Sequence, residues 1–233
     1  IFMASIFITG SNRGLGLAIA KYYAKQNWYV HASFRDNNSL TELLKLQNTF
    51  PNTVQLHQLD VRDNSSTKAV KKNLSGIPID ILVNNAGISI DRNDTIGNLN
   101  YDSWNEVLNV NLLGSARTTE MLLDNVVIGE RKIITFISSD LASFGAHDGR
   151  QLHYYRTSKV ALNMFMRTLS FDLEKKGIIL FSFHPGWIRT DMGGTNAAID
   201  PEQSVQGFVD LINIADKSMS GKYFDWNGRS LLW

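Results

Sequence analysis

Short apolar runs alternate with longer amphipathic stretches along almost the whole 233-residue chain. The runs have the length of buried strands, and the stretches have the apolar spacing of helices. Two parallel strands need such a helical crossover between them, whereas antiparallel strands can be joined by a short hairpin. The alternation therefore predicts an α/β fold with one open, doubly wound parallel sheet and helices on both faces. No Pro/Ser-rich linker, charge block or internal repeat divides the sequence, so we expect a single domain over residues 1–233.

The individual elements follow from the period of the apolar residues and from the residues that begin and end helices. The predicted strands cover residues 4–9, 28–34, 54–59, 79–83, 132–137, 178–183 and 222–224. The predicted helices cover residues 15–26, 39–48, a stretch that begins near 64, 101–127 in one piece or two, 154–175 and 201–214. The specific signals at helix ends are a capping box of Ser39 with Glu42, a C-terminal cap at Gly177, and Asp200 with Pro201 at the start of the last helix.

The composition excludes several kinds of protein. The formal net charge is +1 and the Lys and Arg residues are scattered, so we expect no surface for nucleic acid. The sequence has no cysteine, which excludes disulfides, thiolate nucleophiles and cysteine-based zinc sites, and its five histidines lack metal-ligand spacing. No apolar run reaches the roughly 18 residues of a membrane span, and no secretory signal is visible. We expect a cytoplasmic protein that uses no metal and no membrane.

A glycine-rich segment, TGSNRGLG at residues 9–16, follows the first predicted strand and opens the first predicted helix. Glycines at this crossover permit a tight turn and let the backbone approach a pyrophosphate, which the helix N-terminus attracts. The spacing is G-x-x-x-G-x-G and not the common G-x-G-x-x-G, so a plain tight turn is the alternative. The position of the segment favours a dinucleotide site in a Rossmann-type sheet.

The end of the second predicted strand indicates which dinucleotide binds. An acidic residue at this position holds the adenine ribose hydroxyls of NAD. Here the strand ends in Phe34-Arg35, and Asp36 comes one or two positions late. Arg13 in the glycine segment adds a second cation, and two guanidinium groups suit a 2′-phosphate because each can bind it with two hydrogen bonds. These residues favour NADP(H) over NAD(H); the alternative is that both arginines are ordinary surface residues.

Two further segments are expected at the same edge of the sheet. Asp60 follows the third strand, where its carboxylate can accept a hydrogen bond from the adenine amino group; the alternative is an acid that merely precedes a helix. Asn84-Asn85-Ala86-Gly87 ends the fourth strand at the carboxyl edge, where open sheets bind ligands. Its small residues permit close approach of a cofactor, and the alternative is a turn without a ligand.

Tyr155 and Lys159 lie four residues apart on a predicted helix and therefore share one face. A phenol has a solution pKa near ~10. A neighbouring ammonium and a positively charged nicotinamide lower that pKa toward the range of a proton shuttle. Tyr154 competes with Tyr155 by proximity but has no lysine four residues later. A Tyr-x-x-x-Lys pair is more often two ordinary residues on the protein surface. The hypothesis of a catalytic pair therefore depends on the residues around it.

Polar residues from two other segments are expected beside this pair. Ser138 and Ser139 follow the fifth strand at the carboxyl edge, and a serine hydroxyl there can hold a substrate oxygen. The stretch between Ser139 and Tyr155 is long enough for a loop that returns to the site. Asn111 lies in a helical segment, NVNLLG, that must pack beside the helix of Tyr155 if the sheet is doubly wound.

Together these motifs resemble the classical short-chain dehydrogenases/reductases and stand in the order found in that family. The matching segments are TGSNRGLG, NNAG, the Asn111 segment, ISS at 137–139, YRTSK at 155–159 and Pro185-Gly186, which extend over essentially the whole chain. HPGWIRTDMGG at 184–194 and the last segment, GKYFDWNGRSLLW, look like the C-factor/sniffer-like branch. The resemblance implies a carbonyl reductase that transfers a hydride between NADP(H) and a small-molecule carbonyl or alcohol substrate.

The resemblance also implies a role for each site residue. Tyr155 would be the acid/base at the carbonyl oxygen, and Lys159 would lower the tyrosine pKa and hold the nicotinamide ribose. Ser139, with Ser138 as second choice, would polarise the carbonyl, and Asn111 would support a water relay to Lys159. Besides Tyr155 and Lys159, the residues expected to contact the cofactor are Gly10, Asn12, Arg13, Gly14, Leu15, Gly16, Arg35, Asp60, Val61, Asn85, Ala86, Gly87, Pro185, Gly186, Ile188 and Thr190.

Further expectations concern the lid and the assembly. The resemblance implies that residues 191–198 form a mobile lid over the substrate. It also implies a homodimer or homotetramer built through the helices at 101–127 and 154–175, which would be exposed in a monomer. Ala142 departs from the family, which often has glycine three residues after the serine, and the polar stretch 144–152 is expected to shape the substrate mouth. The substrate itself does not follow from the sequence.

A second hypothesis is a cofactor-sensing or signalling protein that retains the dehydrogenase fold with incidental catalysis. The C-factor name comes from a developmental signal, which gives this hypothesis its basis. The four expected catalytic positions, Asn111, Ser139, Tyr155 and Lys159, are nevertheless intact. A pure binding module has no need of the serine or the lysine, so the sequence favours an enzyme.

Overall fold

Strands and helices alternate along the chain in the computed structural model, which describes residues 3–37, 40–91, 94–145, 149 and 151–233. The strands are β1 (Ser5–Ile8), β2 (Tyr29–Phe34), β3 (Val54–Gln58), β4 (Ile81–Asn84), β5 (Ile133–Ile137), β6 (Ile179–His184) and β7 (Lys222–Asp225). The α-helices are α1 (Gly14–Lys25), α2 (Thr41–Thr49), α3 (Asn64–Asn73), α4 (Tyr101–Leu108), α5 (Ser115–Val127), α6 (His153–Asp172) and α7 (Pro201–Ile214). Among the described helices, none is both long and apolar enough to cross a membrane.

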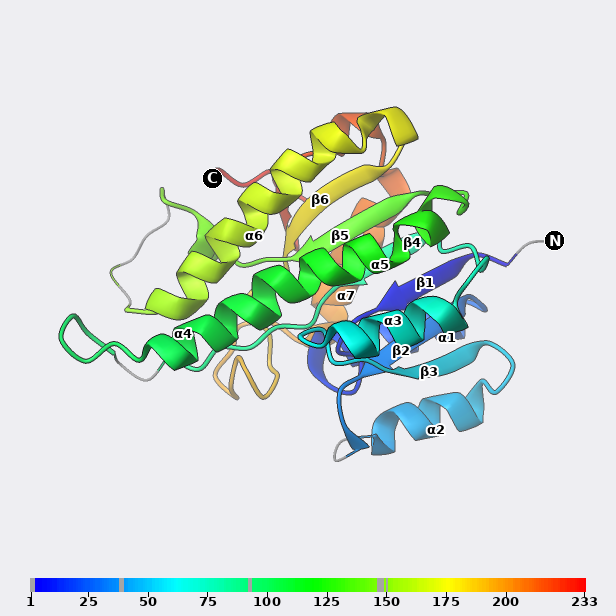
Figure 1. Cartoon of the computed structure of the whole chain (residues 1–233), viewed down its shortest axis with the longest axis horizontal. Coiled ribbons are helices and arrows are strands. Elements are labelled where there is room, and N and C mark those ends of the chain that lie inside the picture. The colour runs from blue at the N-terminus through cyan, green and yellow to red at the C-terminus, as the bar shows by residue number, and fades with distance from the viewer. Residues whose placement is uncertain (1–2, 38–39, 92–93, 146–148, 150) are drawn as a thin grey trace.

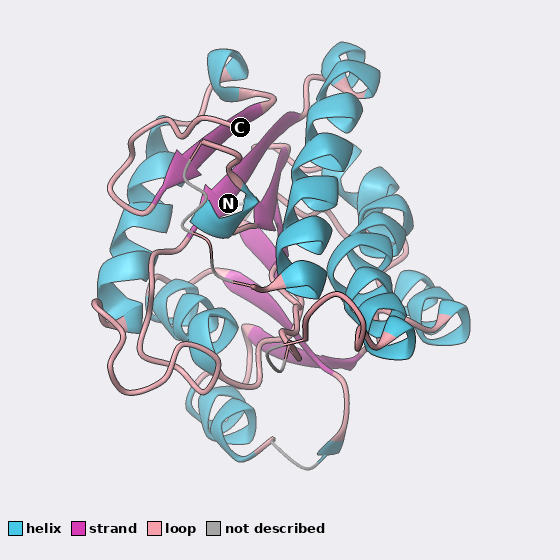
Figure 2. Cartoon of the chain, turned by 90° about the vertical axis from the view of Figure 1, so that its left-hand side faces the viewer, coloured by secondary structure: helices cyan, strands magenta, loops and turns pink. Residues whose placement is uncertain are grey.

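The strands form one parallel sheet in the order β3-β2-β1-β4-β5-β6-β7. The chain starts in the middle, builds outward to β3, returns beside β1 with β4, and then builds outward to β7. Because crossovers between parallel strands are right-handed as a rule, the two directions of growth place helices on opposite faces, and Figure 2 shows helices on both faces. The predicted doubly wound, single-domain sheet is confirmed.

Successive residues of each strand face two separate cores. Ile6 and Ile8 of β1 belong to the core beneath α1, α2 and α7, whereas Phe7 belongs to the core beneath α3, α5 and α6. This is the alternation of a strand, in which neighbouring side chains point to opposite faces. Both faces are covered, which explains why β1, β4 and β5 are buried along their whole length. In Figure 1 the pair α4–α5 and α6 run side by side in front of the sheet.

Several predicted helix ends can be compared with the structure. The last helix begins as predicted, with Asp200 and Gln203 forming a capping box and Pro201 in the first turn. The helix of Tyr155 ends at Asp172, earlier than predicted, and a short 3₁₀ turn follows it before Gly177. That glycine, with φ of 70°, therefore ends the turn and not the α-helix. The predicted cap Ser39 lies outside the described residues.

The predicted helix at 101–127 is one continuous helix with a change of winding in its middle. A π-helical segment, Asn109–Gly114, joins α4 to α5 without a break. Such segments contain about one extra residue per turn and are frequent at functional sites. Here the segment contains Asn111, whose side chain is fully buried.

Two buried histidines meet on neighbouring strands of the sheet. His31 of β2 and His57 of β3 lie with Nδ1 of the first 3.0 Å from Nε2 of the second, beside the ring of Phe7. Burial lowers the pKa of His31 to about 3, with a further contribution from His57. Burial also lowers the pKa of His57 to about 4. Both rings are therefore neutral in the folded protein at neutral pH.

This pair predicts a loss of stability in mild acid. Below the ordinary histidine pKa of about 6.5, the unfolded chain takes up protons that the folded pair refuses, so unfolding becomes easier as the pH falls toward 4. We expect the melting temperature of His57→Gln to fall less between roughly pH 7 and pH 5 than that of the unaltered protein. His153→Gln, which removes a histidine at the start of α6, serves as the control. Equal falls in all three proteins would contradict the assignment.

Candidate active site

A cavity of about 950 Å³ lies where the strands from β1 to β6 end. The loops that follow these six strands supply its wall, together with the first turns of α1 and α6. Every residue predicted for the site lines this cavity except Gly16 and Asn111, which lie behind the lining. Parallel strands bring their carboxyl ends to one edge, and for this reason motifs distant in sequence meet here.

The glycine segment forms a close-fitting cradle between β1 and α1. Gly10 and Gly14 have φ of 64° and 53°, a conformation that favours glycine. A Cβ on Gly16 would lie 2.5 Å from both the carbonyl oxygen of Gly10 and Nδ2 of Asn85, so a side chain there would push the segment away from the β4 loop. The cradle thus keeps bare backbone against the cavity.

The start of α1 suits an anion. Among the described side chains, none caps this helix, and its first turn contains no acidic residue. Its free backbone N–H groups and the positive end of its dipole therefore remain available at the cavity. The pyrophosphate of a dinucleotide is an anion of the kind that such helix starts bind.

Hydrogen bonds join the cradle to the loop after β4. Thr9 Oγ1 accepts from the backbone N–H groups of Asn85 and Ala86, at 2.9 and 2.8 Å. Asn85 Nδ2 donates to the carbonyl oxygens of Thr9 and Gly10, at 2.8 and 3.1 Å. The asparagine is thus a structural link between the two loops, in addition to lining the cavity.

The two arginines predicted to select the coenzyme lie at the cavity, each paired with a carboxylate. Arg13 Nη1 is 3.0 Å from Asp191 Oδ2, and Arg35 Nε is 3.0 Å from Asp36 Oδ2. The arginine side chains are 63% and 58% exposed. Ion pairs this exposed contribute little, so a phosphate can compete for either guanidinium. The pairing with Asp191 joins the glycine cradle to the predicted lid.

Asp60 lines the cavity, but its carboxylate is already bound by a residue that the sequence analysis did not single out. Arg62 Nη2 lies 2.6 Å from Asp60 Oδ2, and Arg62 Nη1 lies 2.5 Å from Glu106 Oε1. The hydrogen bond from Arg62 lowers the pKa of Asp60, so the carboxylate is charged at neutral pH. An adenine amino group would have to share this carboxylate, and the role assigned to Asp60 stays a prediction.

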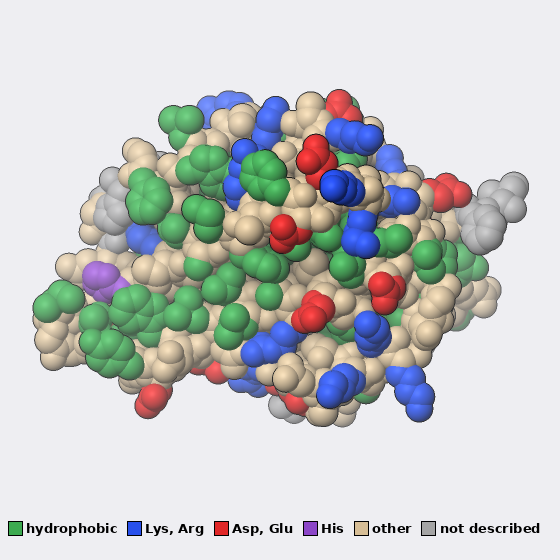
Figure 3. All heavy atoms as spheres, turned by 45° about the horizontal axis from the view of Figure 1, so that its top comes forward, with side chains coloured by type: hydrophobic (Ala, Val, Ile, Leu, Met, Phe, Trp, Pro, Cys, Tyr) green, Lys and Arg blue, Asp and Glu red, His purple; other side chains and the backbone are tan. Residues whose placement is uncertain are grey.

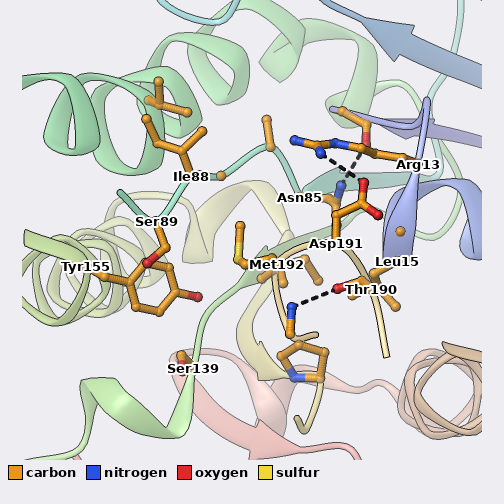
Figure 4. A pocket seen from close by; sticks show the side chains of 18 of the residues that line it. Arg13, Leu15, Asn85, Ile88, Ser89, Ser139, Tyr155, Thr190, Asp191 and Met192 are labelled. Atoms are coloured by element: carbon orange, nitrogen blue, oxygen red, sulfur yellow. Dashed lines mark hydrogen bonds and ion pairs between the residues drawn. The ribbon is translucent and has the colours of Figure 1, made fainter. Parts of the chain in front are cut away.

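Tyr155 and Ser139 lie together at the other end of the cavity (Figure 4), and Lys159 lines the same cavity. The Lys159 side chain is buried, its Nζ donates to the carbonyl oxygen of Ile137 at 2.8 Å, and it lies 5.6 Å from the centre of the Tyr155 ring. Burial lowers the pKa of Lys159 to about 8. Ser139 Oγ is 3.2 Å from Asp140 Oδ1, and the Tyr223 hydroxyl donates to the Ser139 carbonyl oxygen.

The protonation of Tyr155 depends on opposing effects. Burial raises its pKa to about 12, the hydrogen bond with Ser139 lowers it, and the charge of Asp140 raises it. The protein therefore holds the phenol protonated, which suits a donor of a proton. The predicted lowering of this pKa by Lys159 is not among these effects and stays a prediction for the coenzyme-bound state.

The choice between neighbouring tyrosines is resolved by where their hydroxyls lie. Tyr154 is fully buried, and its hydroxyl accepts from the backbone N–H of Asn100 at 2.6 Å, beside the ring of Trp104. Tyr155 lines the cavity. Tyr154 thus belongs to the contact between α4 and α6, and Tyr155 alone of the two faces the site.

Asn111 holds two elements together behind the cavity. Its Oδ1 accepts from the N–H of Ile88 at 2.8 Å, and its Nδ2 donates to the Ile88 carbonyl oxygen and to Ser158 Oγ, both at 2.9 Å. A Cβ built on Gly87 would lie 3.4 Å from Asn111 Oδ1 and 3.5 Å from Lys159 Nζ, so both polar groups border that glycine. The water relay assigned to Asn111 stays a prediction.

Near Tyr155 the cavity is also lined by Ile88, Ser89, Asp140 and Leu141, to which the sequence analysis gave no role. Leu152 of the predicted mouth, Met192 of the predicted lid, and His184 and Trp187 of the segment 184–194 line it too. Ile88 and Ser89 directly follow the NNAG segment, and this adjacency was the signal that could have found them. Burial lowers the pKa of His184, whose Nε2 lies 3.8 Å from Asp140 Oδ1. Part of the predicted mouth at 144–152 lies outside the described residues.

The predicted lid begins at the cavity and continues as a series of turns. Asp191, Met192 and Gly193 line the cavity, and Trp187 Nε1 donates to the Gly193 carbonyl oxygen at 2.8 Å. A parallel bridge between Ile188 and Ile199 closes the base of the segment. Within the described part of the chain, no three His, Asp or Glu side chains gather as a metal site would require.

Comparisons with known proteins agree with this geometry. The sequence profile of the family described as "short chain dehydrogenase" matches residues 4–200. C-signal of Myxococcus xanthus is 33% identical over 166 residues, which cover 71% of this chain and 99% of that protein. The structure of the carbonyl reductase Sniffer of Drosophila melanogaster superposes with a TM-score of 0.91 at 28% identity, and both chains are covered completely.

A coenzyme complex is among the similar structures. The NADPH-bound carbonyl reductase from chicken fatty liver superposes with a TM-score of 0.90 at 28% identity, again over the whole of both chains. A profile that matches most of the chain, the ordered motifs and the shared sheet all point the same way. The chain belongs to the short-chain dehydrogenase family of oxidoreductases.

Proposed function

We propose that this protein is an NADP(H)-dependent carbonyl reductase with Tyr155 as its acid/base. The observation that carries the proposal is one cavity with the glycine cradle at one end and Tyr155, Ser139 and Lys159 at the other. The cradle fits a dinucleotide because it presents bare backbone and the start of a helix. When bound, the coenzyme would supply a hydride to the carbonyl carbon of the substrate.

The side chains of the protein would manage the proton and the orientation. Ser139 Oγ would donate a hydrogen bond to the carbonyl oxygen and hold it beside the phenol of Tyr155. The phenol, kept protonated by burial, would give its proton to that oxygen as negative charge develops there. The Lys159 ammonium would stabilise the resulting phenolate and hold the ribose of the coenzyme. In the opposite direction the same groups would take the proton from an alcohol.

Replacing the tyrosine should separate chemistry from binding. We expect Tyr155→Phe to lower kcat by about 100- to 10,000-fold, the contribution of a positioned general acid, while the dissociation constant for NADPH changes less than twofold. Oxidation of NADPH with a panel of aldehydes, ketones and quinones measures the first, and quenching of protein fluorescence the second. Tyr154→Phe, which removes a hydroxyl outside the cavity, is the matched comparison. Full activity of Tyr155→Phe would exclude the tyrosine as the acid.

The preference for NADP(H) over NAD(H) is supported by Arg13 and Arg35 at one end of the cavity and by the NADPH bound to the chicken reductase. A 2′-phosphate would displace the exposed partner of each arginine, Asp191 or Asp36. This exchange is favourable if the phosphate, with up to two charges, forms stronger hydrogen bonds than the single carboxylate.

The coenzyme preference can be tested by removing these cations. Because one charged hydrogen bond contributes roughly 1.5–3 kcal/mol, we expect Arg35→Ala and Arg13→Ala each to raise KM for NADPH by about tenfold or more. The KM for NADH should change little, as should both constants in Lys45→Ala, which removes a surface cation away from the cavity. Steady-state kinetics with both coenzymes provides the measurement, and equal losses with NADPH and NADH would exclude a phosphate-specific role.

Signalling is a second candidate function, favoured by the similarity to C-signal. In that case the cavity would bind the coenzyme, and binding would itself be the signal. The same panel of carbonyl compounds distinguishes the two: tight binding of NADPH without turnover of any compound supports the sensor. The convergence of Ser139, Tyr155 and Lys159 supports the enzyme.

We also propose that copies of the chain associate through α4, α5 and α6, and that residues 191–198 act as a lid. Figure 3 shows apolar side chains spread over the face that these helices form. Large apolar residues on this face are 68% exposed at Tyr101, 65% at Met164 and 61% at Phe171, and Leu113 of the π-helical segment is 46% exposed. We expect sedimentation to find a dimer or tetramer and Met164→Glu to shift it toward the monomer. A monomeric unaltered protein would contradict the association.

A further inference from the structure

The backbone of Tyr155 is bound by a side chain from the loop after β4. Asp91 in that loop lies far from α6 in sequence, yet its Oδ1 accepts from the N–H of Tyr154 at 2.8 Å and its Oδ2 accepts from the N–H of Tyr155 at 3.1 Å. Both oxygens of one carboxylate therefore bind the first turn of the helix.

The start of α6 needs such a partner. Its N-cap residue is Leu152, which has no side-chain acceptor, and the first turn contains no acidic residue. The first N–H groups of a helix have no partner within the helix, and a carboxylate near them also interacts favourably with the helix dipole. Asp91 supplies both the acceptor and the charge from outside the helix.

The backbone carbonyl group of Tyr155 also has a hydrogen-bond partner. The carbonyl oxygen of Tyr155 accepts from Ser158 Oγ at 2.7 Å, and that hydroxyl in turn accepts from Asn111 Nδ2. Asn111 is bound to both backbone groups of Ile88, in the loop that contains Asp91. The loop therefore contacts the backbone of Tyr155 directly through Asp91 and indirectly through Asn111 and Ser158.

Lys159, one turn later, is held differently. Its ammonium donates to the carbonyl oxygen of Ile137 in β5, so its position does not depend on the first turn of α6. Loss of Asp91 would leave two N–H groups without a partner and loosen the turn of Tyr155, while the lysine and the coenzyme cradle stay in place. Misplacing a reacting group by about 1 Å can lower a rate by 100-fold.

We propose that Asp91 is a positioning residue that holds Tyr155 at the reacting atoms by binding the backbone of its helical turn. The proposal rests on the proposed function for its effect on rate, but the anchoring itself is a property of the protein without substrate. Asp91 also joins the coenzyme side of the site to the acid, because the loop that contains it begins with Asn85, Ala86 and Gly87 at the cavity.

Two substitutions at this position should give a graded loss. Asp91→Ala removes both acceptors, and we expect kcat to fall by about 10- to 100-fold. Asp91→Asn keeps one oxygen that can accept a hydrogen bond, so its kcat should lie between those of Asp91→Ala and the unaltered protein. The KM and the dissociation constant for NADPH should change less than twofold in both. Asp102→Asn, an exposed acid in the first turn of α4, controls for the lost charge.

Amide hydrogen exchange tests the anchoring without any substrate. We expect the peptide that contains residues 153–158 to exchange at least several-fold faster in both Asp91 variants, with residues 159–172 unchanged. Exchange equal to that of the unaltered protein would overturn the proposal, as would faster exchange with an unchanged kcat. A parallel loss of kcat, NADPH affinity and melting temperature would also overturn it, because a merely structural role gives that pattern. If the unaltered protein reduces no carbonyl compound, the proposed function fails, while the exchange rates still show whether Asp91 anchors the turn.

Discussion

The site depends on the hydrogen bonds that lock the loop after β1 to the loop after β4. Thr9 and Asn85 exchange these bonds through both side chain and backbone, in a partly buried place where an unpaired polar group would be costly. The pairing of the parallel strands β1 and β4 brings the two loops together, and their small residues let them approach. Fixing these loops fixes the glycine cradle on one side and, through Ile88 and Asp91, the helix of the tyrosine on the other.

Local signals made the fold and the chemical core predictable. The glycine segment and the Tyr155–Lys159 pair are each recognisable within a few residues, but each is a weak signal alone. The alternation of strands with helices places them at one edge of the sheet, and their order with the other motifs makes the prediction specific. The open, doubly wound parallel sheet was therefore predicted, although not its exact strand order. Nearly all of the predicted site residues line one cavity. Gly16 is an instructive exception, because it serves the site by leaving room for Asn85 and not by facing the cavity.

The residues that the sequence did not indicate act through contacts between distant segments. Nothing in the sequence near Arg62 indicates its ion pairs with both Asp60 and Glu106. Likewise, nothing near Asp91 indicates that its carboxylate binds the first turn of α6. The ion pair of Arg13 could not be predicted because its partner, Asp191, is distant in the sequence. The partner of Arg35 is its neighbour Asp36, which the sequence analysis considered only for its distance from the end of the strand. The end of α6 was misjudged because Gly177 ends a separate 3₁₀ turn.

The π-helical segment between α4 and α5 changes the directions in which the two flanking helices present their side chains. One residue added to an α-helix turns everything beyond it by about 100°, so the extra residue lets the two flanking stretches present differently oriented faces. Asn111 can thereby turn inward toward Ile88 and Ser158 while Val107 and Leu122 remain in the apolar interior. Removing a single residue here would restore regular winding and bring a different side chain to the place of Asn111. The position of Asn111 thus depends on the length of this segment as well as on its composition.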